Sequence, residues 1–204
     1  MILFCVNFLR CKIIEASVWW KVHDINEATQ MKGMDIHQQL VDLLTAGEAR
    51  FRVMEHEAMG KCEAVSEIRG TQLSQGAKAL VCKVKGNGVK QVVLAVLGAD
   101  LQADLSLLAQ HLGGTKASLA SPAEVDELTR CVFGAIPPFS FHPSLRLVAD
   151  PLLFERHDEI AFNAGLLEKS IIMDTADYLR LAKPTQIAFH RAASTSASQE
   201  TAPQ

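Results

Sequence analysis

The sequence predicts an α/β protein of the α+β type, with helices packed outside a mixed and curled β-sheet. Strand-like segments come in clusters that are interrupted by helical segments, instead of alternating one by one as in regular βαβ units. In addition, 49% of the 204 residues are hydrophobic and 21% are charged. This composition and this length are typical of a globular chain that can bury one core.

The elements before residue 75 are predicted to be two helices and a strand. Residues 35–47 carry an apolar stripe at helical spacing that ends at a glycine. Residues 50–56, RFRVMEH, alternate between apolar and polar side chains like a strand. Residues 62–70, CEAVSEIRG, favour a short helix that Gly70 ends.

The remaining strands are predicted in two groups. Residues 77–84 and 90–98 form a hairpin, because Asn87-Gly88 between them favours a tight turn. The second group lies in the last third of the chain and comprises residues 145–150, 159–165 and 169–174.

Three further helices separate or follow these strands. Residues 102–114 end in two glycines, which is a common way for a helix to stop. Residues 121–131 begin with Ser121 and Glu124 at the spacing of a capping box. Residues 175–182 form the last helix, which ends shortly before a proline.

The chain is predicted to hold one domain, over residues 34–190. Residues 1–33 have weak periodicity and contain both tryptophans, so we expect an N-terminal extension outside the domain. Translation of the natural product is expected to begin at Met31 or Met34. Residues 191–204 are small and polar, which is typical of a flexible tail.

Bulk composition excludes several classes of function. The net charge is −3 and aromatic residues make up 6%, so neither DNA binding nor a broad base-stacking surface is expected. The five cysteines form no CxxC pair and no zinc-binding spacing, which favours reduced thiols in the cytoplasm and no metal or organic cofactor. The apolar start of the chain is too short to span a membrane, and we expect no membrane partner.

The segment FGAIPPFSF, residues 133–141, is the most unusual stretch. Pro137 and Pro138 have no N–H and stiffen the chain, whereas Gly134 can adopt a positive φ. One interpretation is a rigid connector covered by its phenylalanines, and the pattern alone favours it. The other is a bend that presents the N–H groups of Gly134, Ala135 and Ile136 to an oxyanion.

Lys78 lies near the start of a predicted strand, in phase with Leu80 and the other apolar side chains of one face. Periodicity alone favours a lysine that extends to solvent at the strand end. The alternative is a lysine that lines a cavity and meets an anionic or carbonyl group. His56 follows a strand, where a structural histidine is favoured over a residue at the rim of a site.

Taken together and in this order, GAKALVCKV, GAIPPF and DEIAFNAG resemble motifs of the YbaK/ProX family of aminoacyl-tRNA deacylases, relatives of the prolyl-tRNA synthetase editing domain. The resemblance covers residues 35–190 and HEAMGKCEAVSEIRG adds to it. It identifies Lys78 with the family lysine and residues 134–138 with the family GxxxP loop. It implies a mixed sheet curled toward a barrel, with flanking helices, in a stand-alone enzyme.

The resemblance also implies a function, namely hydrolysis of the ester between a wrong, small amino acid and the 3′ end of a tRNA. Ser, Thr or Ala is the expected acid, and water attacks with help from the substrate ribose hydroxyl. Lys78 would grip either a phosphate or the acyl end, and the backbone of residues 134–136 would stabilise the oxyanion. Further substrate contacts are expected from Leu80, Phe133, Pro137, Pro138, Asn163, Ala164, Gly165 and His56.

Asn163 is expected either to add a hydrogen bond to the substrate or to shape its turn. Lys83, Lys85 and Lys90 flank the hairpin, with Lys61 and Arg69 nearby in sequence. They form either a local basic patch for tRNA phosphates or an ordinary solvated hairpin. Two other functions stay open, a non-catalytic module that binds tRNA or a synthetase, and an esterase for small aminoacyl compounds.

Overall fold

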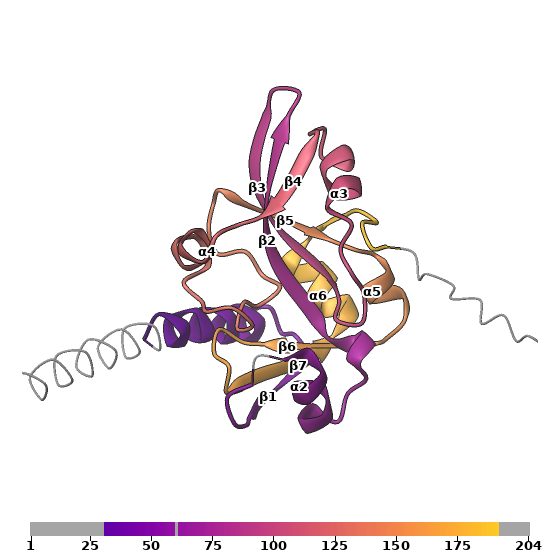
Figure 1. Ribbon diagram of the computed structural model, residues 1–204. Helices are drawn as coiled ribbons and strands as arrows, with labels where there is room; N and C mark the ends of the chain where they lie inside the picture. Colours follow the sequence, from indigo (N-terminus) through magenta and orange to yellow (C-terminus); the bar gives the residue numbers. More distant parts are fainter. Residues whose placement is uncertain (1–30, 60, 192–204) are drawn as a thin grey trace, which may run out of the picture.

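The computed structural model describes residues 31–59 and 61–191 of the protein (Figure 1). The predictions for residues 1–30 and 192–204 lie outside this range. Residues 31–33, which the sequence pattern assigned to the extension, are helical. None of the helices within the described range has the length and apolar character needed to cross a membrane.

A three-stranded antiparallel sheet forms one side of the molecule, in the order β1-β7-β6. Its central strand has the sequence KSIIMD, and four consecutive residues of it are buried, as expected for a strand covered on both faces. The strands are β1 (Phe51–Glu55), β6 (Glu159–Asn163) and β7 (Lys169–Asp174).

A five-stranded mixed sheet forms the other part, in the order β4-β2-β3-β5-β8. Its β2–β3 hairpin turns at Asn87 and Gly88, whose φ angles of 52° and 78° match the turn that the sequence predicted. β5 and β8 are added in parallel orientation. The strands are β2 (Ala77–Gly86), β3 (Val89–Gly98), β4 (Lys116–Leu119), β5 (Leu145–Ala149) and β8 (Thr185–Gln186).

Helices lie around these sheets, and their ends follow local sequence rules. α2 ends at Gly70 with φ of 66°, and the capping box of Ser121 and Glu124 begins α4. The helix over residues 31–46 is longer than the predicted one. The others are α2 (Cys62–Arg69), the 3₁₀ helix η1 (Leu73–Gln75), α3 (Leu105–His111), α4 (Pro122–Thr129), α5 (Leu152–Glu155) and α6 (Thr175–Ala182).

β3 is buried on both faces. The five-stranded sheet lies between two hydrophobic clusters, and each face of β3 packs against one of them. Leu94 and Val96 belong to the larger cluster, which also takes in residues of the three-stranded sheet and of the helix over residues 31–46. Val93 and Leu97 belong to the second cluster, which α3 covers. The two-residue period of the strand therefore sends alternate side chains to different cores.

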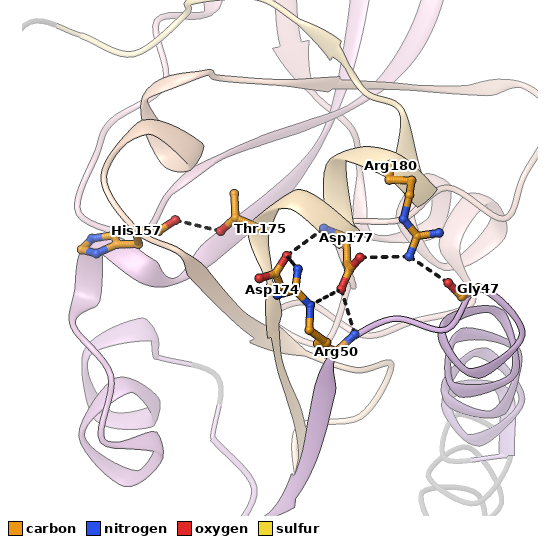
Figure 2. Close-up of polar contacts among 7 residues, drawn as sticks. All are labelled: Gly47, Arg50, His157, Asp174, Thr175, Asp177 and Arg180. Atoms are coloured by element: carbon orange, nitrogen blue, oxygen red, sulfur yellow. Dashed lines mark hydrogen bonds and ion pairs between the residues drawn. The ribbon is translucent and has the colours of Figure 1, made fainter.

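A polar cluster around Asp177 joins the N-terminal elements to α6 (Figure 2). The Asp177 carboxylate accepts hydrogen bonds from the Arg50 N–H at 2.9 Å and from Arg50 Nε at 3.0 Å. Arg180 donates to Asp177 at 2.9 Å and to the Gly47 carbonyl at 2.8 Å. The start of β1 and the end of the first helix are thus held to α6 by one buried carboxylate.

The mixed α/β architecture is confirmed, but a single barrel-like sheet is not. The two sheets are separate, and in neither do the outermost strands pair with each other. A single parallel bridge between Gly76 and Ala161 links them. Four short elements, η1, β4, α5 and β8, were not predicted, because segments of two to four residues carry too few side chains to show a period.

Candidate active site

A pocket lies at the seam between the two sheets, where the start of β2 approaches the end of β6. Its volume is about 70 Å³. α2 and the bend before residue 137 close it. The pocket is lined by Cys62, Val65, Arg69, Gly76, Ala77, Lys78, Ala79, Ala99, Gly134, Ile136, Ala161, Phe162 and Asn163.

The bend over residues 132–138 supplies one wall of the pocket. Gly134 has a φ of 85°, in the left-handed region that glycine adopts without steric cost. The Ala135 N–H donates to the Val132 carbonyl at 3.1 Å, and the Ala135 carbonyl accepts from the Gly165 N–H at 2.9 Å. No described residue accepts a hydrogen bond from the N–H of Gly134 or Ile136. Two of the three predicted donors therefore have no partner among the described residues.

The proline side of the bend is held from below by α6. Tyr178 is fully buried and donates its hydroxyl to the Pro138 carbonyl at 2.8 Å. Its ring packs edge-on against Phe139, with centroids 5.1 Å apart. Burial raises the pKa of the Tyr178 hydroxyl above its ordinary value, so this group stays a donor. The bend thus rests on a fixed aromatic support.

Lys78 also lines the pocket and lies at the start of β2. Its ammonium donates to the Leu101 carbonyl at 2.5 Å and to the Ala99 carbonyl at 3.4 Å. No carboxylate within the described part of the chain pairs with it at ion-pair distance. An ammonium has three N–H donors, so at least one stays available for a guest in the pocket.

Asn163 connects the bend to a buried arginine. Its Nδ2 donates to the Gly134 carbonyl at 2.6 Å, while its Oδ1 accepts from Arg69 Nη2 at 2.6 Å. Arg69 Nε donates to Ser170 Oγ at 2.9 Å. Asn163, Arg69 and Ser170 are all buried. This network fixes the orientation of the Gly134 peptide relative to α2.

His56 lies behind this network and outside the pocket lining. Its Nδ1 is 2.8 Å from the Glu57 carbonyl, which can only accept, so Nδ1 carries a proton. Its Nε2 is 2.6 Å from Ser170 Oγ. His56 therefore supports Ser170 rather than lining the pocket.

Among the residues that the structure describes, no group of three or more His, Cys, Asp or Glu side chains is arranged to hold a metal ion. Three cysteines are described, and none of them forms a disulfide. Burial raises the pKa of the Cys82 and Cys131 thiols to about 12. Neither of these two is a thiolate at neutral pH.

Known proteins resemble this chain in sequence and in fold. The model of the aminoacyl-tRNA editing domain family matches residues 56–181, more than half of the chain. The chain belongs to this family. The family expected from the sequence motifs is thereby confirmed.

Two relatives and two solved structures are similar to the chain. The multifunctional Ser/Thr-tRNA deacylase ProXp-y of Escherichia coli strain K12 is 74% identical to this chain over 162 residues. The matched residues cover 79% of this chain and 97% of the relative. The protein of the same name from Escherichia coli O157:H7 matches with the same values. A structure described as a candidate trans-editing enzyme for prolyl-tRNA synthetase has a TM-score of 0.65 at 20% identity and covers 76% of this chain and 97% of its own. The hypothetical protein APE2540 has a TM-score of 0.66 at 18% identity, with coverage of 74% and 99%. The two structures show a shared fold.

The structure of this family member brings several predicted site residues together. Lys78, Gly134, Ile136 and Asn163 all line the pocket. Leu80 does not, because it packs in the core cluster on the α3 side of the sheet. Six further predicted contacts are also absent from the pocket lining, namely Ala135, Phe133, Pro137, Pro138, Ala164 and Gly165.

Arg69 is the residue of the site whose place the sequence analysis missed. It was grouped with the lysines of the hairpin, whereas the structure buries it to 8% exposure in the pocket wall. Burial lowers the pKa of its guanidinium to about 10. The signal was present in the sequence, since Arg69 lies four residues after Val65 and thus on the apolar face of α2.

The lysines of the hairpin differ in whether they form an ion pair. Lys83 forms an ion pair with Glu124 at 2.8 Å. Lys85 lies directly opposite Lys90 on one side and opposite Lys116 on the other, so three exposed lysines form a row across β3, β2 and β4. Lys61 is exposed at the start of α2.

Proposed function

We propose that the protein is a trans-editing deacylase that hydrolyses the ester of tRNA mischarged with Ser or Thr. The relative that is 74% identical, and of which this chain covers 97%, bears the name of a Ser/Thr-tRNA deacylase. The observation that supports the proposal is that Lys78, Gly134 and Ile136 line one small pocket, and that the N–H groups of Gly134 and Ile136 have no acceptor among the described residues.

In the proposed reaction, the ester carbonyl enters the pocket with its oxygen toward the N–H groups of Gly134 and Ile136. Water adds to the carbonyl carbon, the oxygen takes up negative charge, and the two N–H groups stabilise it. The bond to the ribose oxygen then breaks, and that oxygen leaves with a proton as the free hydroxyl of the tRNA. An aminoacyl ester is already activated, so no side-chain nucleophile is required, and a ribose hydroxyl of the substrate assists the water.

Lys78 is proposed to anchor the substrate. Two carbonyls accept hydrogen bonds from its ammonium, and we propose that the remaining N–H binds an oxygen of the guest. Because Ala135 uses its N–H within the bend, we restrict the proposed oxyanion donors to Gly134 and Ile136. Asn163 is proposed to position the bend through its bond to the Gly134 carbonyl.

The tRNA body is proposed to contact the row formed by Lys85, Lys90 and Lys116. Along β2, Lys85 lies seven residues from Lys78, which corresponds to about 23 Å of extended chain. A single-stranded 3′ end in the pocket would leave the stem of the tRNA near this row. We further propose that the chain acts in the cytoplasm, beside the synthetases that make its substrate.

The test is hydrolysis of Ser-tRNA and Thr-tRNA by the protein and by Lys78→Ala. We expect a rate that is lower by roughly 100-fold in the variant, because an anchoring charged hydrogen bond is lost. Lys83→Ala is the matched control on the same strand and is expected to retain the rate. Unchanged hydrolysis by Lys78→Ala would contradict the proposed site.

The same assay separates the two alternative functions. Binding of charged tRNA without turnover would indicate a binding module, and equal activity on a free seryl ester would indicate a simple esterase.

A further inference from the structure

Arg69 is a buried cation for which no described carboxylate is a partner. It is 8% exposed, and no acidic group within the described range lies at ion-pair distance from it. Removing a guanidinium from water without a counter-charge is costly, and its lowered pKa reflects this burial. The chain tolerates this cost at a residue that lines the pocket.

The guanidinium is fixed on one side and free on the other. Nε and Nη2 donate to Ser170 and Asn163, and both distances are below 3.0 Å. Nη1 donates to no described residue. In the described range, Thr71 Oγ1 is the only fully buried side-chain nitrogen or oxygen without a hydrogen-bond partner. Nη1 also lacks a described partner but does not belong to this class, so it reaches accessible space. The free donors of a rigidly held group are thus available to an acceptor in the pocket.

The distance between Arg69 and the bend restricts what that acceptor can be. Asn163 bridges them, since its Oδ1 accepts from Arg69 and its Nδ2 donates to the Gly134 carbonyl. A guest whose ester carbonyl meets the Gly134 and Ile136 N–H groups would therefore place its own side chain, rather than its ribose or phosphate, near Arg69. The pocket is small, about 70 Å³, which favours a small aminoacyl group as the part of the guest that enters it.

We infer that Arg69 recognises the side-chain hydroxyl of the aminoacyl group and so selects seryl and threonyl esters over their alkyl counterparts. This inference rests on the proposed deacylase function. Apart from Cys62, Lys78 and Asn163, the other side chains of the lining are apolar. The Asn163 amide is already bonded to Arg69 and to the Gly134 carbonyl, so the guanidinium is the polar contact that we assign to such a hydroxyl. When an alkyl side chain replaces the hydroxyl, the free N–H groups stay buried without an acceptor, which raises the barrier.

The experiment measures single-turnover hydrolysis of one tRNA charged in turn with Ser, Ala, Thr or α-aminobutyrate, which is threonine with a hydrogen in place of its side-chain hydroxyl. The protein is expected to prefer each hydroxyl-bearing acid by about 10- to 100-fold. In Arg69→Met both ratios are expected to approach one, chiefly because the Ser and Thr rates fall. Ser170→Ala removes a partner of Arg69 but leaves the free donors, and it is expected to keep the ratios while lowering all rates together.

Three results separate the possible failures. A lack of hydrolysis of every charged tRNA by the unmodified protein would overturn the proposed function itself. Equal rates for Ser and Ala in the unmodified protein would overturn hydroxyl recognition, whether or not any variant folds. Ratios that stay unchanged in Arg69→Met, or in Arg69→Lys if the first variant does not fold, would overturn the assignment to Arg69.

Discussion

At the scale of single residues, the site depends on main-chain geometry as much as on side chains. Gly134 and Ile136 contribute N–H groups, which any residue but proline has, so their chemistry is not visible in their side-chain types. What distinguishes Gly134 is its φ of 85°. Any other residue would be strained there, and the direction of the neighbouring peptide would change.

We therefore expect Gly134→Ala to lower kcat by roughly 10- to 100-fold, because the proposed oxyanion donors are displaced. KM is expected to change little. Gly88→Ala is the matched control, since Gly88 also has a positive φ of 78°, and an added Cβ there would meet nothing within 4 Å. If both variants lost activity equally, backbone strain in general, rather than the bend, would be responsible.

At the scale of elements, the β2–β3 hairpin with β4 carries the clearest feature outside the pocket. Like charges that lie directly opposite each other destabilise a sheet, yet Lys85 faces a lysine on each side. By contrast, Lys83 is neutralised by Glu124, whose pKa is lowered to about 2, first by its hydrogen bond with Lys83 and then by those with Ser121. The lysine row has no such partner in the described chain.

The prediction for this row concerns the salt dependence of tRNA binding. Replacing Lys85, Lys90 and Lys116 together by Gln should reduce the slope of log K against log salt concentration by roughly 2 to 3, because each phosphate contact contributes about 0.7 to 0.9. Lys83→Gln should leave the slope unchanged. Hydrolysis of a free seryl ester should be unaffected by the triple replacement. A slope that does not respond would mean that the row is an ordinary solvated surface.

At the scale of the whole molecule, the pocket exists because two sheets meet without merging. The bridge between Gly76 and Ala161 brings the start of β2 to β6, and the bend and α2 close the seam. The relative position of the sheets in turn depends on α6, which carries Tyr178 beneath the bend and Asp177 beside the first helix.

The Asp177 cluster leads to a prediction about stability and pH. Hydrogen bonds from the Arg50 backbone, Arg180 and the Arg50 side chain lower the pKa of Asp177 below its ordinary value of 3.8. Such a group stabilises the folded state above its unfolded pKa, and this contribution is lost as the pH falls below that value. Asp177→Asn should lower the melting temperature at pH 7 by roughly 5 °C.

Between pH 7 and pH 3 the variant should lose less stability than the unmodified protein, since the titrating carboxylate is absent. Thermal unfolding followed by circular dichroism at several pH values measures both effects. Asp42→Asn, on an exposed helix surface with a single bond to Gln38, is the control and should change neither. Parallel pH profiles for Asp177→Asn and the unmodified protein would contradict the proposed role of this cluster.

The sequence by itself determined most of the elements, because their signals are local. The turn at Asn87-Gly88, the stop at Gly70 and the capping box at Ser121 depend on residues a few positions apart, and each was predicted and is present. Motif order also identified the family. Lys78 could be singled out, but its period in the strand did not decide between solvent and a cavity.

The tertiary structure decided everything that depends on residues distant in the chain. Only the meeting of the sheets places Lys78, Gly134 and Asn163 around one pocket, and only packing shows that the Ala135 N–H is already used. The sequence predicted Arg69 as a surface charge, whereas in the structure it is buried and bonded to Asn163 of β6 and Ser170 of β7. The physical reason is that helix ends and turns are governed by neighbouring backbone groups. Burial, and with it the chemistry of a cation, is set by partners that lie more than a hundred residues away in the chain.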